Sequence, residues 1–297
     1  MRDAHINHAF LDGVLAGERV DTYYHFGVAS DDPILDRFRD VRAIVLAGSG
    51  DRIEVFARRW SAAHGGAEVI ALPKEERFVT RYCAGVLFAS HGMGMPSASI
   101  AVQELLRMLF FLKDGDHGAL AEVFWARVGT SGGVGLPGGT VVVSTEGVMA
   151  DLGPFRLLQG GTGEYRFDGT FPADVAADIA AASAGSGIPV ELGRTVAGNE
   201  FFLEQYRLDG AICMETPASK QAWLEWIHRE GVRNIEMEGA MLAGYLNHWG
   251  FPRFAMICTT LLDRLVGDQV TATPEELASF NERSGDVLFR YLTATLG

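Results

Sequence analysis

The chain has 297 residues, a formal net charge of −13 and 48% hydrophobic residues. This charge argues against a nucleic-acid partner or an anionic membrane surface. The first residues lack the apolar core of a signal peptide, and we expect no stretch to be apolar enough to span a membrane. The three cysteines, Cys83, Cys213 and Cys258, lie in apolar runs without metal-ligand spacing. We therefore expect buried, reduced thiols in a cytoplasmic protein.

Strands and helices are predicted to alternate along the chain. The predicted strands are 41–47, 69–72, 83–89, 121–128, 140–144, 233–237 and 253–262. The predicted helices are 51–64, a segment that Pro96 opens, 172–184, 217–230, a segment that ends at His248, and 275–296. Near-continuous apolar strands indicate burial on both faces, so we predict an α/β fold with helices on both sides of the sheet.

No composition shift divides the chain, which predicts one domain over residues 1–297. Within it, residues 1–22 are expected to form a poorly ordered N-terminal extension. The glycine-rich segment 152–169 is expected to be a surface loop.

Three glycine-rich turns each follow a predicted strand, at 48–52, 90–94 and 129–133. In open α/β sheets, ligands bind beyond the carboxyl ends of the strands. Arg127 lies two residues before the third turn, and a guanidinium beside unpaired backbone N–H groups favours a bound oxyanion. The turns therefore indicate one pocket for a small anion. The plain alternative for Arg127 is an ion pair at an ordinary tight turn.

Five segments together resemble the uridine phosphorylases of the nucleoside phosphorylase superfamily. They are SHGMGMPSASI (90–100), RVGTSGGVGLPGGTVV (127–142), EQYRLDGAIC (204–213), VRNIEMEGA (232–240) and TTLLDRLVGDQV (259–270). The resemblance runs from Tyr24 to Val270, and the SHGMG turn is most similar to the eukaryotic-type enzymes.

The resemblance implies a single α/β domain around a mixed, partly closed sheet. It implies a pentosyltransferase of pyrimidine salvage that reversibly converts uridine and phosphate into uracil and ribose 1-phosphate, with deoxyuridine or thymidine as further substrates. It also implies a homodimer, with a hexamer as the alternative, and no cofactor, since phosphate is a co-substrate.

The family pattern assigns residues to each part of the substrates. Phosphate would be held by Gly48, Arg52, Arg127, Thr130 and the neighbouring subunit's Arg77. Ribose would contact Thr130, Glu236, Met237 and Glu238, with the neighbouring subunit's His25 reaching the 5′-hydroxyl. Several planar donors suit a dianion, and a carboxylate beside the sugar stabilises the positive charge that develops as the glycosidic bond loosens. Without the pattern, Arg52, Arg77 and His25 would be taken for ordinary surface residues.

The base would be read by Gln205 and Arg207, because an amide both donates and accepts and a guanidinium stabilises the departing uracil anion. The resemblance places Phe201, Leu261, Leu262, Asp263, Arg264 and Val270 around the base. It makes Arg127, Glu238, Arg207 and Gln205 the catalytic set. For Phe201 and the leucines, ordinary core packing is the alternative.

The chain departs from the family pattern at four positions. Gly50 replaces a proline, which predicts a more mobile phosphate loop, and Gly239 replaces a serine, which predicts a looser helix start. Asp263 stands where uridine phosphorylases carry asparagine, and a protonated carboxyl there would help a purine leave. Broad or purine-shifted base specificity therefore stays open. Phe78 replaces the glutamate on which the potassium site of bacterial members depends, so we predict no metal.

Three other readings remain. A nucleosidase would use water and would not need Arg52, Arg77 and Arg127. A dinucleotide-binding oxidoreductase would need a third glycine that neither GxG motif supplies. A non-catalytic nucleoside-binding homologue would be expected to lack the arginines or Glu238, and all of these are present.

Overall fold

The chain folds into two units, and the boundary between them falls within strand β7 (Phe124–Gly133). The computed structural model describes residues 6–74, 77–161 and 163–296. One unit comprises Met1–Arg127 and Trp249–Arg253, and the other Val128–His248 and Phe254–Gly297. We call them unit 1 and unit 2. The prediction of one domain over residues 1–297 stays a prediction.

In unit 1, the strands follow the order β7-β3-β6-β5-β4. Strand β3 (Ala43–Ala47) pairs in parallel with β6 (Val86–Ser90), while β5 (Thr80–Cys83) is antiparallel to both β6 and β4 (Ile70–Ala71). Every residue of β3 and β6 is buried. This burial agrees with their continuous apolar sequence and confirms the reading of 41–47 as a central strand.

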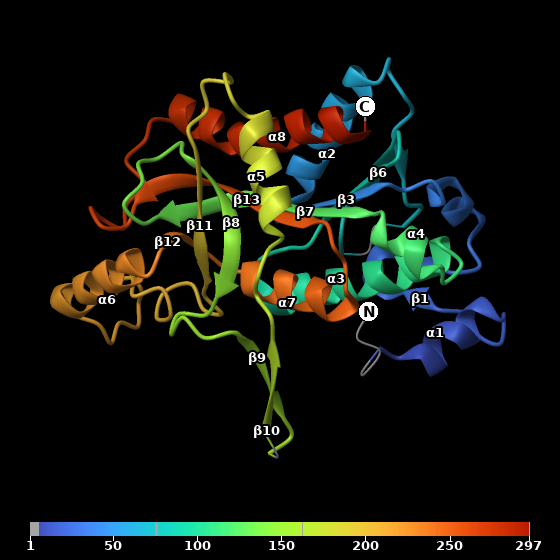
Figure 1. The fold of residues 1–297 in the computed structure, drawn as a ribbon, viewed down its shortest axis with the longest axis horizontal. Coiled ribbons are helices and arrows are strands. Elements are labelled where there is room, and N and C mark those ends of the chain that lie inside the picture. The colour runs from blue at the N-terminus through green and yellow to red at the C-terminus, as the bar shows by residue number, and fades with distance from the viewer. Residues whose placement is uncertain (1–5, 75–76, 162, 297) are drawn as a thin grey trace. The chain divides into compact units, whose positions relative to one another are not determined.

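Two long helices cover the strands of unit 1. Figure 1 shows α2 (Gly50–Ala63) on one side of β3 and β6 and α3 (Gly94–Leu112) on the other. The remaining elements are α1 (His8–Leu15), β1 (Thr22–Tyr23), the 3₁₀ helices η1 (Tyr24–Phe26) and η2 (Pro33–Phe38), β2 (Val28–Ala29) and α4 (His117–Ala121). The predicted N-terminal extension thus contains a helix, and its residues 1–5 lie outside the described residues.

Five strands of unit 2 close into a ring. Strands β8 (Val141–Val148), β11 (Val190–Ala197), β12 (Val232–Glu236) and β13 (Phe254–Asp263) join the end of β7 in the order β12-β11-β8-β13-β7. Strand β12 also pairs with β7, where Asn234 lies opposite Gly133. Strand β11 is parallel to its neighbours and β13 is antiparallel to β8. The predicted mixed, partly closed sheet with flanking helices is therefore confirmed.

A chain of buried polar side chains joins four strands of this ring. Ser144 Oγ lies 2.6 Å from Thr195 Oγ1, which donates to Asn234 Oδ1 at 2.7 Å. Asn234 Nδ2 donates in turn to Ser131 Oγ at 3.0 Å. Buried polar groups are costly unless paired, so this chain favours one strand register over others.

The helices of unit 2 are α5 (Ala173–Ala182), α6 (Pro217–Arg229), α7 (Gly239–Trp249) and α8 (Pro274–Leu296). Helices α5 and α8 lie side by side against β8 and β13 (Figure 1). The predicted surface loop 152–169 is wrong, because β9 (Phe155–Gln159) and β10 (Gly163–Phe167) form an antiparallel hairpin that extends from the barrel. The rings of Phe155 and Phe167 pack on Tyr245 of α7, which explains why this segment is ordered.

Two further sequence expectations need correction. Helix α3 has the length and apolar composition to cross a membrane, and it is instead packed among α1, β1, η1 and η2 of unit 1. Cys213 is exposed on a loop, while Cys83 and Cys258 are buried as expected. An apolar run near a glycine does not distinguish a strand from a loop, so the reading of Cys213 as buried is wrong.

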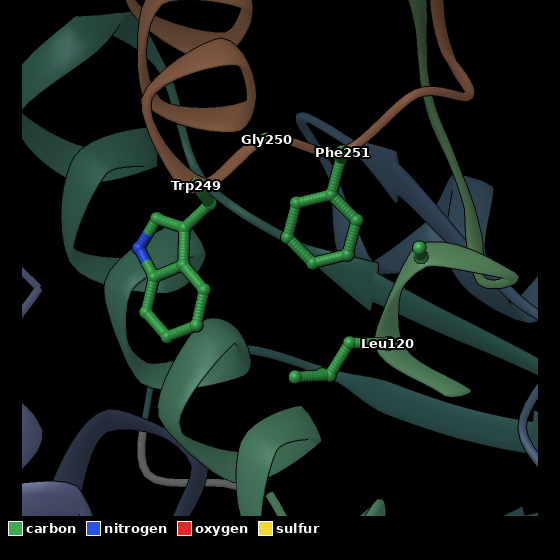
Figure 2. Close-up of a pocket in the computed structure, with 5 residues that line it drawn as sticks. Leu120, Trp249, Gly250 and Phe251 are labelled. Atoms are coloured by element: carbon green, nitrogen blue, oxygen red, sulfur yellow. The ribbon is translucent and has the colours of Figure 1, made fainter. Parts of the chain in front are cut away.

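Unit 1 contains a shallow apolar pocket that is too small to hold a water molecule (Figure 2). It is lined by Leu120, Ala121, Trp249, Gly250 and Phe251. None of the predicted site residues is among them. The pocket has almost no polar lining, so nothing there would orient a phosphate or a nucleoside.

Candidate functional site

Two of the predicted glycine turns lie side by side in unit 1. The backbone N–H of His91 donates to the carbonyl of Ala47 at 2.9 Å, which joins the segment after β6 to the end of β3. Gly48 directly follows β3, and Ser49 caps α2 by accepting the N–H of Arg52 at 3.4 Å. A helix N-terminus beside an arginine attracts anions. This arrangement suits the predicted phosphate-binding role of Gly48 and Arg52.

Gly50 has a packing role that the sequence does not show. It is the first residue of α2, and a Cβ at this position would lie 2.6 Å from Val79 Cγ2. The close approach of Val79 therefore requires glycine here, in addition to any effect on loop mobility.

The third predicted turn is wrong, because residues 129–133 belong to strand β7. Gly132 and Gly133 lie opposite Ile235 and Asn234 of β12, and the carbonyl of Gly133 accepts the N–H of Arg264. Small residues without side-chain cover permit this close pairing. The anion site therefore cannot be a set of unpaired turn amides. Arg127, which is 7% exposed, and Thr130 both lie on this strand, and their phosphate-binding roles stay predictions.

The two residues predicted to act across a subunit interface lie together in unit 1. The carbonyl of His25 accepts the N–H groups of Arg77 at 3.0 Å and Phe78 at 3.2 Å. Glu104 of α3 accepts the N–H of His25 at 3.0 Å and lies 2.7 Å from its Nδ1. This contact fixes the ring orientation and directs Nε2 away from the carboxylate. Sequence reasoning missed Glu104, whose position in an apolar helix was the available signal.

The prediction of no metal rests on Phe78. Its side chain is buried and packs on the rings of Phe26 and His25. Within residues 6–74, 77–161 and 163–296, no group of three histidine, cysteine, aspartate or glutamate side chains is arranged to hold a metal ion. The absence of a metal cofactor stays a prediction.

The ribose motif follows strand β12 in unit 2. Both oxygens of Glu236 are engaged at the start of α7, where they accept the N–H groups of Glu238 at 2.7 Å and Gly239 at 2.8 Å. A buried carboxylate at a helix N-terminus stabilises that turn. The geometry therefore gives Glu236 the role of shaping the turn that presents Met237 and Glu238. The Glu238 side chain is itself 3% exposed.

The predicted base-reading residue Gln205 is placed close to this motif. Gly198 donates its N–H to the carbonyl of Glu236, and a Cβ on Gly198 would lie 2.9 Å from Gln205 Cγ. Gln205 is 4% exposed, and among the described residues its Nε2 has no hydrogen-bond partner. Buried amides are nearly always paired, so this one suits a bound ligand.

Tyr206 lies between the two base-reading residues and has a strained backbone conformation. Its φ of 53° lies in the left-handed region, and its ring stacks on Trp223 of α6 with centroids 4.5 Å apart. Stacking offsets the cost of the backbone strain.

Arg207 is held by two kinds of contact. Asp209 accepts a bidentate pair from its guanidinium, Nε at 2.9 Å and Nη2 at 2.7 Å, and the Phe201 ring lies 4.6 Å from its Cζ. The hydrogen bonds from Arg207 lower the pKa of Asp209 below its ordinary value. Phe201 itself is 40% exposed, so it is not ordinary core.

Arg264 and Asp263 have structural partners. Arg264 is 1% exposed and donates through Nη2 to the carbonyl of Gln205 at 2.7 Å. Asp263 Oδ1 accepts the N–H groups of Gly135 and Leu265, each at 3.0 Å. An asparagine oxygen could accept the same two N–H groups. This geometry offers no support for a purine-protonating role of Asp263.

The apolar residues predicted around the base lie at and beyond the end of β13. Leu261 and Leu262 are half-buried on the strand, and Val270 is 43% exposed. Asp209 and Asp268 were missed by sequence reasoning. The closely spaced charges in 204–209 and 263–269 were the signal for ion pairs.

Comparison with known proteins gives consistent matches over most of the chain. A family model described as "Phosphorylase superfamily" matches residues 42–297. "Uridine and thymidine phosphorylase" of Caenorhabditis elegans is 36% identical over 93% of this chain and 90% of its own length. "Inactive uridine phosphorylase B" of Schistosoma mansoni is 30% identical over 93% of each. The crystal structure of uridine phosphorylase from Schistosoma mansoni in complex with 5-fluorouracil superposes with a TM-score of 0.87 at 33% identity, covering 95% of this chain and 97% of that one.

Proposed function

Because the chain belongs to the phosphorylase superfamily, we propose that it is a uridine phosphorylase, which cleaves uridine with inorganic phosphate into uracil and ribose 1-phosphate. The observation that carries this proposal is the buried Gln205 amide, whose Nε2 has no partner among the described residues. It lies two residues from Arg207 and against Gly198 at the ribose motif. The names of the relatives, which are uridine phosphorylases, support the same activity.

The base-reading pair would act on the leaving group. The Gln205 amide can donate to a uracil carbonyl and accept from N3–H. As the glycosidic bond breaks, negative charge builds on the base. The Arg207 guanidinium, held in a fixed orientation by Asp209, stabilises that charge without reorganising.

Ribose and phosphate would be bound by the remaining predicted residues. Glu238 accepts the 2′- and 3′-hydroxyls, and its charge stabilises an oxocarbenium-like sugar. Gly48, Arg52, Arg127 and Thr130 bind phosphate, the nucleophile. Positioning this dianion supplies much of the rate.

We extend the proposal to thymidine and deoxyuridine as further substrates. One relative is named a uridine and thymidine phosphorylase, and the Schistosoma mansoni enzyme is also described in complex with thymidine. The ratio of thymidine to uridine turnover tests this extension.

The proposed assembly is a homodimer in which His25 and Arg77 serve the neighbouring subunit's site. The exposed side chains of Tyr24, the first residue of η1, and Met93, which directly precedes α3, support an interface there. Subunit mixing tests it. After random reassociation of His25→Ala with Glu238→Ala, about a quarter of the wild-type activity should return, because each heterodimer regains one intact site. Failure of mixing to restore activity would contradict the sharing of residues between subunits.

We place the protein in the cytoplasm, since no disulfide joins the described cysteines.

The activity is tested by incubating the protein with uridine or inosine, with and without phosphate, and measuring the released base. Phosphate-dependent release of uracil supports the proposal, and faster release of hypoxanthine would shift it to a purine substrate. No cleavage of either nucleoside would support the second candidate, a nucleoside-binding protein without activity. That candidate is kept because a relative of similar identity is named inactive.

A further inference from the structure

Two short segments of unit 2 are bound to each other over their whole length. One, residues 205–209, carries both predicted base-reading side chains, and the other, residues 264–269, follows strand β13. Four hydrogen bonds join them: Arg264 Nη2 to Gln205 O at 2.7 Å, Arg207 Nη2 to Asp268 O at 3.2 Å, Leu208 N to Asp268 Oδ2 at 3.3 Å, and Gln269 Nε2 to Asp209 Oδ2 at 3.0 Å.

Asp268 is the centre of this arrangement. Its side chain is 7% exposed and accepts Arg264 Nε at 2.8 Å, while Lys220 Nζ of α6 lies 2.8 Å from its other oxygen. Burial raises the pKa of Asp268, but Lys220 and Arg264 outweigh this effect, so the pKa is lower than its ordinary value. Asp268 is therefore a buried carboxylate whose charge two cations balance.

The same residue influences both base-reading side chains. Arg264 bonds to Asp268 with Nε and to the carbonyl of Gln205 with Nη2, so it transmits the position of the carboxylate to Gln205. Asp268 also contacts Arg207 through its own carbonyl and Leu208 through its carboxylate. Side chains held from two directions have little freedom, which is what discrimination between bases requires.

We propose that Asp268 is a positioning residue for base recognition, which holds Gln205 and Arg207 in the geometry that reads a pyrimidine. It touches no substrate atom. It acts through Arg264, through the guanidinium of Arg207 and through the backbone N–H of Leu208. This inference rests on the proposed uridine phosphorylase activity of the same site.

The test compares Asp268→Asn with the matched control Asp151→Asn. Asp151 also lies in unit 2, pairs with Arg156 at 2.5 Å and accepts the N–H of Gly153 at 3.0 Å, but it is outside both segments. Steady-state kinetics give the KM for uridine, the KM for phosphate and the kcat/KM ratio of uridine to inosine for each variant.

In Asp268→Asn, the KM for uridine should rise about tenfold or more, because a charged hydrogen-bond acceptor is lost. The kcat/KM ratio of uridine to inosine should fall by a similar factor. The KM for phosphate should stay within about twofold of the wild-type value, which is the variation expected of a substitution without effect. Asp151→Asn should match the wild type in all three. If Asp268→Asn is too unstable to assay, Asp268→Glu replaces it. This variant keeps the charge but moves the carboxylate by one methylene, and the same change in ratio is expected.

A merely structural role would give a different result. Equal losses for uridine and phosphate, or an unchanged KM for uridine despite a lower Tm, would overturn the inference. An inactive wild-type protein would instead contradict the proposed function. In that case the uracil affinities of the same variants, measured by calorimetry, decide the inference: equal affinities of Asp268→Asn and wild type would refute it.

Discussion

Replacing Gln205 with methionine should affect stability and activity in opposite directions. Gln205 is 4% exposed, and its Nε2 is without a hydrogen-bond partner among the described residues. A buried donor in this state costs about 1–3 kcal/mol. Methionine has a similar length and no such donor, so the variant should avoid this penalty. We expect the free energy of unfolding to rise by about 1 kcal/mol, which raises the Tm by roughly 2 °C.

The activity should fall because the amide would no longer pair with the base. Two neutral hydrogen bonds together contribute about 1–3 kcal/mol, which corresponds to a roughly 5- to 160-fold loss in kcat/KM for uridine. Phosphate is bound by other residues, so its KM should change little.

The assay combines thermal unfolding with uridine phosphorolysis for wild type, Gln205→Met and the control Gln221→Met. Gln221 is exposed on α6 and donates to Glu225 at 3.0 Å, so its replacement should change neither quantity appreciably. A Gln205→Met variant that loses several degrees of Tm would show that the amide is satisfied in the folded protein. Uridine turnover within about threefold of wild type would show that it does not read the base.

Three further predictions concern carboxylates of unit 2. Glu236→Ala removes the acceptor of two buried backbone N–H groups and should destabilise the protein by about 2–4 kcal/mol in urea unfolding. Glu236→Gln should recover part of the loss because one amide oxygen remains, and equal Tm values for the wild type and both variants would contradict the capping role of Glu236. Asp263→Asn should leave the uridine-to-inosine ratio within about twofold of wild type, because either side chain can accept the two N–H groups at that turn; a large shift toward inosine would show that the aspartate does take part in base selection. Burial raises the pKa of Asp268, but Lys220 and Arg264 lower it by a larger amount, so the folded pKa is below the unfolded value of about 3.9. The ionised carboxylate therefore stabilises the fold above about pH 3.9, and this contribution disappears as the pH falls through the folded pKa. Wild type should therefore lose stability more steeply than Asp268→Asn below about pH 4, and parallel pH profiles of unfolding would refute this assignment.

The sequence alone determined the class of fold and the chemistry of the site. Continuous apolar runs predicted the buried strands β3 and β13, because a strand that is buried on both faces carries apolar residues at successive positions. Capping residues and prolines located α2 and α6 within a residue or two, since helix starts depend on local hydrogen bonds. The resemblance to the uridine phosphorylases assigned Gln205 and Glu238 to a nucleoside site, and these two roles stay predictions.

The tertiary structure alone decided how those residues are used. The glycines at 132 and 133 could form a turn or a strand, and pairing with β12, a hundred residues later, made them part of a closed barrel. Arg264 could read a base by its chemistry, but the burial of Asp268 directs it to the carbonyl of Gln205. Such choices depend on partners far apart in the chain, whose distances local sequence patterns do not encode. A charged side chain binds its ligand or its neighbour according to which is within reach after the strands have closed.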